Sequence, residues 1–285
     1  MNLCDYQTIR ELLGRHGFHF SKSLGQNFLI DPQVPYDIAA SSQADGRCGV
    51  LEIGPGIGPL TAELARRAGK VVSVELDKSL LPVLAETMAP YPNVEIVSGD
   101  VLKLDLNALA AEKFQGLRPI VCANLPYNIT TPVLTKLVET PCFETITVLI
   151  QKEVAQRLAA AQGSGDGGAF SVFLQYHMET QYLFDVPREK FLPEPKVTSA
   201  VLRCVRRAHP AVEVEDEAFF FKVARGAFLL RRKTLANSLA AALGMEKAAV
   251  QAAIADCSLP ADIRGERLTL EDFARLAERL AKERR

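Results

Sequence analysis

The stretch Val50-Leu51-Glu52-Ile53-Gly54-Pro55-Gly56-Ile57-Gly58-Pro59-Leu60-Thr61 decides the fold of this 285-residue chain. Its apolar start predicts a buried strand, its glycines predict a tight turn, and the pattern that follows predicts a helix. A strand, a glycine-rich turn and a helix in this order are typical of the first unit of a doubly wound α/β sheet. The dinucleotide fingerprint needs a third glycine where this chain has Pro59, and strictly alternating glycines do not match it. The stretch therefore predicts a nucleotide-type cofactor site that is not an NAD site.

Acidic residues follow the next two predicted strands. Glu75 ends the strand predicted over 71–74 and lies about 20 residues beyond Gly54, where a carboxylate binds ribose hydroxyls in such folds. The strand predicted over 94–98 leads to Asp100, which can accept a hydrogen bond from an adenine amine. A single acid at such a place is more often a solvated loop residue or a helix cap. Because the carboxyl ends of parallel strands converge on one crevice, the ordered series nevertheless predicts a cofactor site.

The fourth strand, predicted over 119–123, leads into Asn124-Leu125-Pro126-Tyr127, which suits the methylation of an exocyclic amine. The side-chain carbonyl of Asn124 and the backbone carbonyl of Leu125 can each accept one amine proton, and Pro126 keeps Leu125 extended. Tyr127 offers a flat face on which a flipped-out base can stack. Alone, the tetrapeptide is equally typical of a strand that ends in a proline turn. After the cofactor motifs, it predicts methyl transfer to adenine N6.

These motifs resemble those of the ribosomal RNA adenine dimethyltransferase family. Residues 52–58 match the E-x-G-x-G-x-G loop of class I methyltransferases, and four further segments are similar to family segments: 23–31, 150–158, 191–201 and 231–239. The bacterial type, which the chain resembles most, dimethylates two adjacent adenines near the 3′ end of 16S rRNA. The resemblance implies an α/β fold, with a class I (Rossmann-like) S-adenosylmethionine-dependent methyltransferase sheet and a smaller C-terminal all-helical domain. It implies S-adenosyl-L-methionine as cofactor, and 16S rRNA or the precursor of the small ribosomal subunit as partner.

Together with the strand-end pattern, the resemblance implies roles for individual residues. The expected cofactor-binding residues are Gln26, Asn27, Leu29, Gly54, Gly56, Glu75, Asp100 and Asn124. The expected catalytic residues around the target adenine are Asn124, Leu125, Pro126, Tyr127 and Phe191, with Phe191 as the second stacking ring. The expected RNA contacts are Arg231, Arg232 and Lys233, in a basic helix anchored by the apolar residues before it. Residues 167–170 depart from the family pattern, which leaves the order of that loop open.

The predicted elements divide the chain into two domains. Apolar strand-like runs alternate with helical patterns from about residue 46 to 203, which indicates a parallel sheet. Strand signals stop near residue 209, and three helices are predicted, over about 216–243, 245–257 and 269 to the end. We therefore expect an S-adenosylmethionine-binding methyltransferase domain over 1–207, with an N-terminal helical extension over 1–45. We expect a helical RNA-binding domain over 208–285.

Composition limits the possible classes of protein. The net charge is only −1, so RNA binding must depend on local basic clusters such as 203–207 and 231–233, although such runs are often solvated faces. The six cysteines form no C-x-x-C motif and the four histidines show no metal spacing, so we expect buried reduced thiols and no metal. No apolar run is long enough for a membrane span, and the N-terminus lacks a signal pattern. We expect a cytoplasmic monomer without membrane contact.

Three alternatives remain. The first is the macrolide-resistance type of 23S rRNA adenine dimethyltransferase, whose members tend to be strongly basic and to carry Ile where this chain has Leu125. The second is a non-catalytic nucleic-acid-binding relative of the mitochondrial transcription-factor type, and the third is a DNA adenine methyltransferase. For the enzyme we expect direct in-line transfer to N6 without a covalent intermediate, with alignment supplying most of the acceleration. No residue is an obvious general base.

Overall fold

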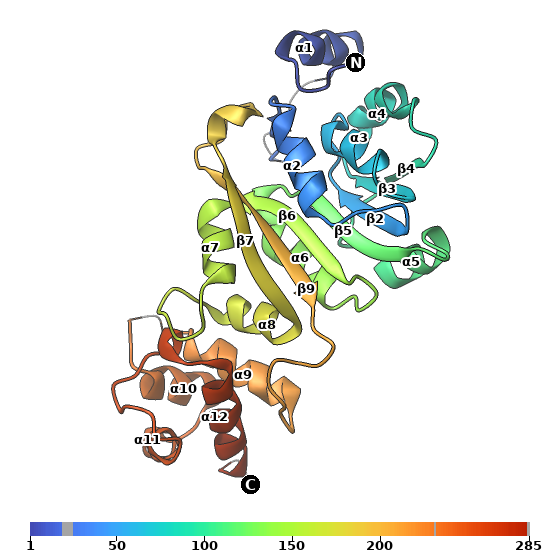
Figure 1. Ribbon diagram of the computed structural model, residues 1–285. Coiled ribbons are helices and arrows are strands. Elements are labelled where there is room, and N and C mark those ends of the chain that lie inside the picture. Colours follow the sequence, from blue (N-terminus) through green and yellow to red (C-terminus); the bar gives the residue numbers. More distant parts are fainter. Residues whose placement is uncertain (19–24, 231, 284–285) are drawn as a thin grey trace. The chain divides into compact units, whose positions relative to one another are not determined.

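A seven-stranded sheet forms the centre of the fold in a computed structural model that describes residues 1–18, 25–230 and 232–283 (Figure 1). The strand order is β4-β3-β2-β5-β6-β9-β7. The strands are β2 (Cys48–Ile53), β3 (Lys70–Glu75), β4 (Val94–Ser98), β5 (Arg118–Asn124), β6 (Thr145–Gln151), β7 (Met178–Val186) and β9 (Ser199–Arg206). A second, two-stranded sheet pairs β1 (Phe28–Leu29) with β8 (Phe191–Leu192). The class I methyltransferase sheet predicted from the sequence is present.

The sheet is mixed, so the prediction of a parallel sheet over the whole region was wrong at one side. Strands β4, β3, β2, β5 and β6 are parallel neighbours, but β9 runs antiparallel to β6 in the register Thr145↔Val205 to Gln151↔Ser199. The chain reaches β9 from β7 through residues 187–198, which contain only the short 3₁₀ turn η4 (Arg188–Lys190) and β8. A parallel crossover usually contains an α-helix, and this connection has none.

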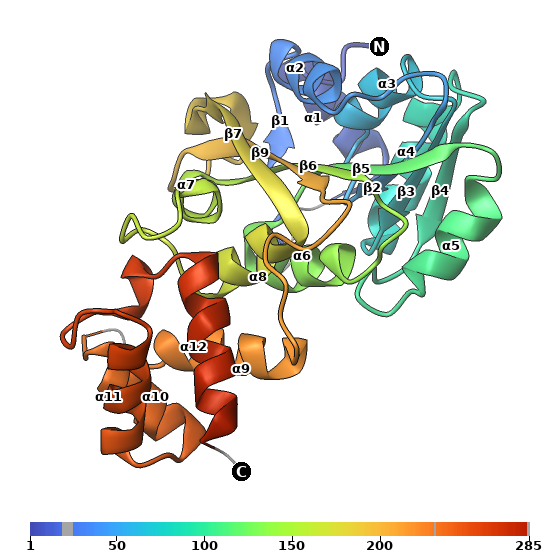
Figure 2. The same cartoon turned by 60° about the horizontal axis from the view of Figure 1, so that its bottom comes forward.

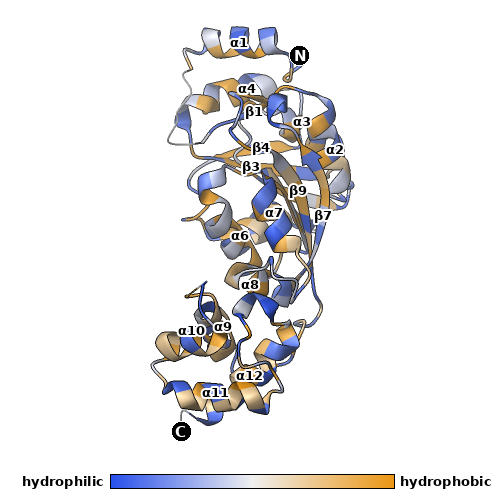
Figure 3. Cartoon of the chain, turned by 90° about the vertical axis from the view of Figure 1, so that its left-hand side faces the viewer, coloured by the Kyte–Doolittle hydropathy of each residue, from blue (hydrophilic) through white to orange (hydrophobic). Residues whose placement is uncertain are grey.

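Helices cover the sheet because its strands are apolar on both faces. They are α1 (Tyr6–Arg15), α2 (Gln33–Ser41), α3 (Pro59–Ala65), α4 (Leu81–Met88), α5 (Leu106–Lys113), α6 (Thr130–Val138) and α7 (Lys152–Ala159). All six residues of β2 are buried, as expected of a central strand with both faces covered. Figure 3 shows β3 and β9 mainly in the hydrophobic colour. Helices α2 and α3 share one core with β2, in which Ile38, Val50 and Leu64 are fully buried.

The chain divides into two compact units: residues 1–155 with 181–206, and residues 156–180 with 207–285. The second unit contains α8 (Ala169–His177), α9 (Glu217–Ala227), α10 (Leu235–Leu243), α11 (Lys247–Asp256), η5 (Gly265–Arg267) and α12 (Leu270–Lys282). Figure 2 shows α9 to α12 grouped together, and their shared core includes the fully buried Phe220 and Phe273. Of the segment 167–170, whose order the sequence left open, the last two residues begin α8. The loop before it is held by Arg267 Nη1, which donates to Ser164 O at 2.9 Å. Within the described residues, no helix is long and apolar enough to cross a membrane.

The helix predicted over 216–243 is two helices, α9 and α10, and this prediction was wrong. A Cβ atom built on Gly226 would lie 2.9 Å from the Cβ of Ala242, so the two helices pack closely against each other. Ser238 Oγ donates to Gly226 O at 2.7 Å and accepts from Leu230 N at 3.0 Å, which holds the connection between them. A single continuous helix could not fold its two apolar halves into one core, whereas a hairpin can.

Candidate cofactor and target-base site

One cavity lies at the carboxyl ends of β2 to β5. Its empty volume, the open mouth included, is about 1100 Å³. The lining includes all the cofactor-binding and catalytic residues that the sequence predicted: Gln26, Asn27, Leu29, Gly54, Gly56, Glu75, Asp100, Asn124, Leu125, Pro126, Tyr127 and Phe191. The structure thus brings these residues together, while their individual roles stay predictions.

The glycine-rich turn after β2 adopts backbone conformations in which a side chain would be strained or too close to a neighbour. Gly54, Gly56 and Gly58 have φ values of 68°, 61° and 94°, in the left-handed region that favours glycine. A Cβ atom on Gly56 would lie 3.1 Å from the ring of Phe28. The turn therefore offers bare backbone to the cavity, which fits the close approach of the methionine part of S-adenosylmethionine.

Two acidic residues extend this wall of the cavity. Glu75, at the end of β3, is 5% exposed and accepts a hydrogen bond from Asp77 N at 2.7 Å. Burial raises the pKa of Glu75, against the opposing effect of hydrogen bonds from the backbone amides of Asp77 and Gly56. Asp100 is half-buried beyond β4, where Leu102 N donates to it at 3.0 Å. These carboxylates fit the ribose hydroxyls and the adenine amine of the cofactor, respectively.

Sequence reasoning missed Glu52 as a lining residue. The side chain of Glu52 is 1% exposed, and its Oε2 accepts hydrogen bonds from Thr61 Oγ1 at 2.7 Å and Ser73 Oγ at 2.6 Å. Burial is the main cause that raises the pKa of Glu52 to about 7; the charge of Glu75 adds to it, and the hydrogen bonds from Ser73 and Thr61 oppose it. The signal in the sequence was a carboxylate inside an otherwise apolar strand. Leu76, 51% exposed although it lines the cavity, was also missed.

The tetrapeptide after β5 has defined backbone and side-chain contacts. Asn124 Nδ2 donates to Asn27 O at 3.4 Å, so its Oδ1 is the part of the amide left to accept from a ligand. Leu125 N donates to Leu149 O at 3.1 Å, and the side chain of Leu125 is buried. Pro126 is extended, with ψ of 133°. That Asn124 Oδ1 and Leu125 O accept the two protons of one amine stays a prediction.

Aromatic rings border the same part of the cavity. The hydroxyl groups of Tyr127 and Ser199 are hydrogen-bonded at 2.7 Å, and Ser199 is fully buried at the start of β9. Burial raises the pKa of Tyr127, so this hydroxyl stays protonated. Phe191 is 3% exposed and belongs to β8. Ser199 was not predicted as a partner of Tyr127, because 72 residues separate them.

The predicted RNA-binding residues lie outside the first unit. Arg231 lies outside the described residues, whereas Arg232 and Lys233 are exposed in the connection between α9 and α10. They are not in a helix as expected, because α10 begins only at residue 235. The predicted apolar anchor is only partly present: Phe228 packs against the core of the helical unit, but Leu229 and Leu230 are 58% and 38% exposed. Arg232 and Lys233 make no ion pair with the described parts of the chain, and their role in RNA binding stays a prediction.

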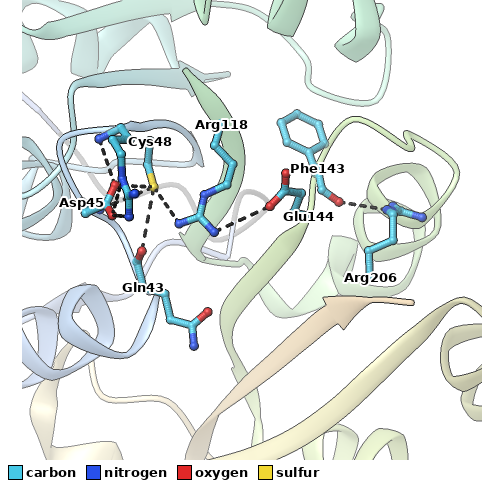
Figure 4. Close-up of polar contacts among 8 residues, drawn as sticks. Gln43, Asp45, Cys48, Arg118, Phe143, Glu144 and Arg206 are labelled. Carbon is cyan, nitrogen blue, oxygen red and sulfur yellow. Dashed lines mark hydrogen bonds and ion pairs between the residues drawn. The ribbon is translucent and has the colours of Figure 1, made fainter. Parts of the chain in front are cut away.

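The other basic run, 203–207, is largely used within the protein itself. Arg206 donates to four backbone carbonyls near the end of α6, including Val138 O at 3.0 Å. Figure 4 shows another of these contacts, with Phe143 O at 2.9 Å. Arg203 donates to Ser41 O at 3.3 Å, and Arg207 donates to Gln175 O at 3.2 Å. These contacts favour a structural role for the run over RNA binding.

The cysteines are structural thiols. Five of the six are buried, and Cys142 is half-buried. Figure 4 shows Cys48 at the amino end of β2, where Arg118 Nη2 donates to its Sγ at 3.2 Å and the thiol donates to Asp45 Oδ1 at 3.3 Å. Burial raises the pKa of Cys204 to about 12. In the described parts of the chain, no cluster of three His, Cys, Asp or Glu side chains is placed to hold a metal ion.

The model of a known protein family, described as ribosomal RNA adenine dimethylase, matches residues 17–282. The chain belongs to this family. A member from a Geobacillus species, named ribosomal RNA small subunit methyltransferase A, is 46% identical and covers 95% of both chains. The crystal structure of the 23S rRNA methyltransferase ErmE is 29% identical with a TM-score of 0.69, and covers 89% of this chain and 99% of ErmE. A dimethyladenosine transferase from Plasmodium falciparum shares the fold at 22% identity, with a TM-score of 0.73 over 90% of this chain and 98% of that one.

Family membership connects the cavity with a reaction. Ribosomal RNA adenine dimethylases use S-adenosylmethionine as methyl donor, and this confirms the family, fold class and cofactor expected from the sequence. Two features of the cavity lining suit this cofactor: the glycine backbone that carries no side chains, and the buried carboxylate of Glu75.

Proposed function

We propose that this chain transfers methyl groups from S-adenosylmethionine to N6 of two adjacent adenines near the 3′ end of 16S rRNA. The reaction is an N6,N6-dimethylation in the biogenesis of the small ribosomal subunit, and the enzyme acts as a monomer in the cytoplasm. The observation that carries the proposal is that one cavity joins the glycine turn, Glu75 and Asp100 to the Asn124–Tyr127 segment and Phe191. The relatives named for the small ribosomal subunit support the choice of RNA.

The protein acts by holding the amine and the base. When bound, S-adenosylmethionine supplies an electrophilic methyl group on its sulfonium. Asn124 Oδ1 and Leu125 O accept the two N6 protons, and this directs the nitrogen lone pair away from them. Tyr127 and Phe191 hold the adenine ring between them, with stacking of about 1–3 kcal/mol per base. Their faces also attract a cationic methyl group by roughly 0.5–2 kcal/mol. The methylated nitrogen then releases one proton to water. One acceptor is left without a proton to accept, so one of the two is dispensable in the second step.

We also assign the two parts of the chain to separate tasks, with residues 1–207 as the cofactor-binding domain and residues 208–285 as the RNA-binding domain, in which Arg231, Arg232 and Lys233 contact phosphates. Residues 156–180 lie in the first domain by sequence but form one compact unit with the second. The exposure of Arg232 and Lys233 supports this assignment. Contacts between these cations and phosphate would release counterions and so make binding depend on salt.

The alternatives have less support. The 23S rRNA methyltransferase ErmE is 29% identical to this chain, against 46% for the small-subunit relatives, and the chain carries Leu125 and a near-neutral charge. A non-catalytic relative has no need of an intact Asn124–Tyr127 segment in the same cavity as the expected cofactor-binding residues, so the presence of this segment favours an enzyme. A DNA adenine methyltransferase is disfavoured because the family model extends through residue 282, over the helical C-terminal part.

The test is primer-extension mapping of dimethyladenine in the rRNA of a strain that lacks this gene, complemented with wild type or with Asn124→Ala. Wild type should restore two adjacent dimethyladenines in 16S rRNA, and Asn124→Ala should restore none, since it removes an acceptor needed in the transition state. Circular dichroism of both proteins is the control for folding, because Asn124 is also expected to contact the cofactor. A modified 23S adenine, or Asn124→Ala turnover within about tenfold of wild type, would contradict the proposal.

A further inference from the structure

The two-stranded sheet of β1 and β8 joins the two walls of the cavity. Its register pairs Phe28 with Leu192 and Leu29 with Phe191. Residues 25–29 line the cavity on the cofactor side, and Phe191 lines it on the base side. Leu29 and Phe191 also belong to one buried core cluster. The backbone that holds the second stacking ring is therefore hydrogen-bonded directly to the segment expected to cover the cofactor.

An ion pair lies at the end of this small sheet. Lys190 Nζ lies 2.6 Å from Asp31 Oδ2, and Ile30 N donates to Lys190 O at 2.9 Å. Asp31 Oδ1 accepts from Gln33 N at 2.9 Å, which fixes the carboxylate at the start of α2. The hydrogen bond from Lys190 is the main reason that the pKa of Asp31 is lowered. Each side chain is partly exposed, at 38% for Lys190 and 27% for Asp31, so the pair can be altered without opening the core.

The residues just before β1 are also connected by hydrogen bonds to Glu75, the carboxylate expected to bind the cofactor. Gln26 Nε2 donates to Asp77 Oδ2 at 2.7 Å, and Asp77 N donates to Glu75 at 2.7 Å. A chain of contacts thus runs from Glu75 through Asp77 and Gln26 into the residues just before β1. The pairing of β1 with β8 continues it to Phe191. A ligand that orders the first part of this chain also restricts the backbone at the second stacking ring.

We propose that Lys190 is a positioning residue which, through its ion pair with Asp31, couples cofactor binding to the seating of the target adenine. The pair holds β8 against β1, so that the cofactor segment and Phe191 are ordered together. Bound cofactor then strengthens RNA binding, and RNA strengthens cofactor binding by the same factor, because linkage is reciprocal. This inference rests on the proposed function and adds an order of binding to it. The two rings that hold the adenine, Tyr127 and Phe191, are both in place only when the cofactor is bound.

The test measures a coupling factor, defined as the dissociation constant of S-adenosylhomocysteine without RNA divided by that with RNA. The RNA probe is a synthetic hairpin of the 3′ end of 16S rRNA that contains two adjacent adenines. Wild type should give a factor above one. Lys190→Met keeps the aliphatic stem and removes the charge, and it should lower the factor by about twofold to fivefold, the range of partly exposed ion pairs. Lys190→Arg should retain most of the coupling.

The chain offers a matched control in the same connection. Arg188 forms an ion pair with Glu194 at 3.0 Å, but both partners lie between β7 and β9, and neither belongs to the cofactor segment. Arg188→Met should therefore leave the coupling factor at the wild-type value, although it also removes one cation. A loss of coupling in Arg188→Met as large as in Lys190→Met would overturn the proposal, because the effect would then be one of general charge.

A double-mutant cycle tests the partner. Asp31→Asn keeps an oxygen to accept from Gln33 N but weakens the ion pair, and it should lower the coupling factor about as much as Lys190→Met. The two substitutions together should have no further effect, because both remove the same interaction. Additive effects, or a wild-type factor of one, would overturn the proposal.

Failure of the proposed function has a different signature. In that case wild type would neither bind the 16S hairpin nor methylate it, and all variants would behave alike. Failure of the coupling idea leaves wild-type methylation intact, while Lys190→Met retains the wild-type coupling factor. A further readout separates positioning from a general structural role. Lys190→Met should raise the KM for the hairpin at low cofactor concentration and change kcat little when both ligands are saturating.

Discussion

Replacing Glu52 by Gln should flatten the dependence of stability on pH. Glu52 is a carboxyl group inside a central strand, 1% exposed, and two hydroxyl donors contact one of its oxygens. Burial raises its pKa from the ordinary 4.5 to about 7. Between these two values the folded protein holds a proton that the unfolded chain releases, so the free energy of unfolding falls as the pH rises. The contribution is complete below about pH 4.5 and is lost as the pH rises through about 7.

The size of the effect follows from the shift. One pKa unit corresponds to about 1.4 kcal/mol, so a rise from 4.5 to about 7 corresponds to about 3 kcal/mol. The Gln carbonyl can still accept from Thr61 and Ser73, but the amide does not ionise. The difference in the free energy of unfolding between Glu52→Gln and wild type should therefore rise by about 3 kcal/mol from acidic to mildly alkaline pH. Any effect of the new amide that does not depend on pH leaves this rise unchanged.

Urea denaturation at about pH 5, 6, 7 and 8 would measure this change by linear extrapolation. The transition of the sheet-containing unit should be followed by circular dichroism, because the two units can unfold separately. Glu139→Gln, at an exposed carboxyl group of the same unit, is the control and should leave the wild-type profile unchanged. A difference between Glu52→Gln and wild type that stays constant across this pH range would refute the reasoning.

Three further outcomes are expected. Glu75→Ala should weaken S-adenosylmethionine binding by roughly 1.5–3 kcal/mol, the value of hydrogen bonds to a charged group, and unchanged calorimetric affinity would remove Glu75 from the site. Tyr127→Phe removes the hydrogen bond to Ser199, and should weaken the stacking of 2-aminopurine at the target position by about 0.5–1.5 kcal/mol in a fluorescence titration; equal quenching would exclude this role for Ser199. Joint replacement of Arg232 and Lys233 by Ala should reduce the slope of log K against log salt by roughly 1.4–1.8 and leave cofactor affinity intact, whereas an unchanged slope would mean a solvated surface.

The sequence by itself determined the class of fold and which strand-end residues line one cavity. The glycine turn, Glu75 and Asp100 each follow a strand directly, so their relation to the sheet is local and can be read from spacing alone. The carboxyl ends of parallel neighbours lie on one side of a sheet, which is why these separate motifs could be assigned to a single cavity before any coordinates. Asn124-Leu125-Pro126-Tyr127 was placed for the same reason.

Only the tertiary structure decided the contacts between distant segments. The hydrogen bond from Tyr127 to Ser199, the ion pair of Asp31 with Lys190 and the polar shell of Glu52 join residues whose separation carries no periodic signal. The break between α9 and α10 also depended on packing, because local helix patterns do not show that two apolar halves must share one core. The role of the basic run 203–207 could not be predicted from the sequence either. Its arginines donate to backbone carbonyls that come close only in the folded chain.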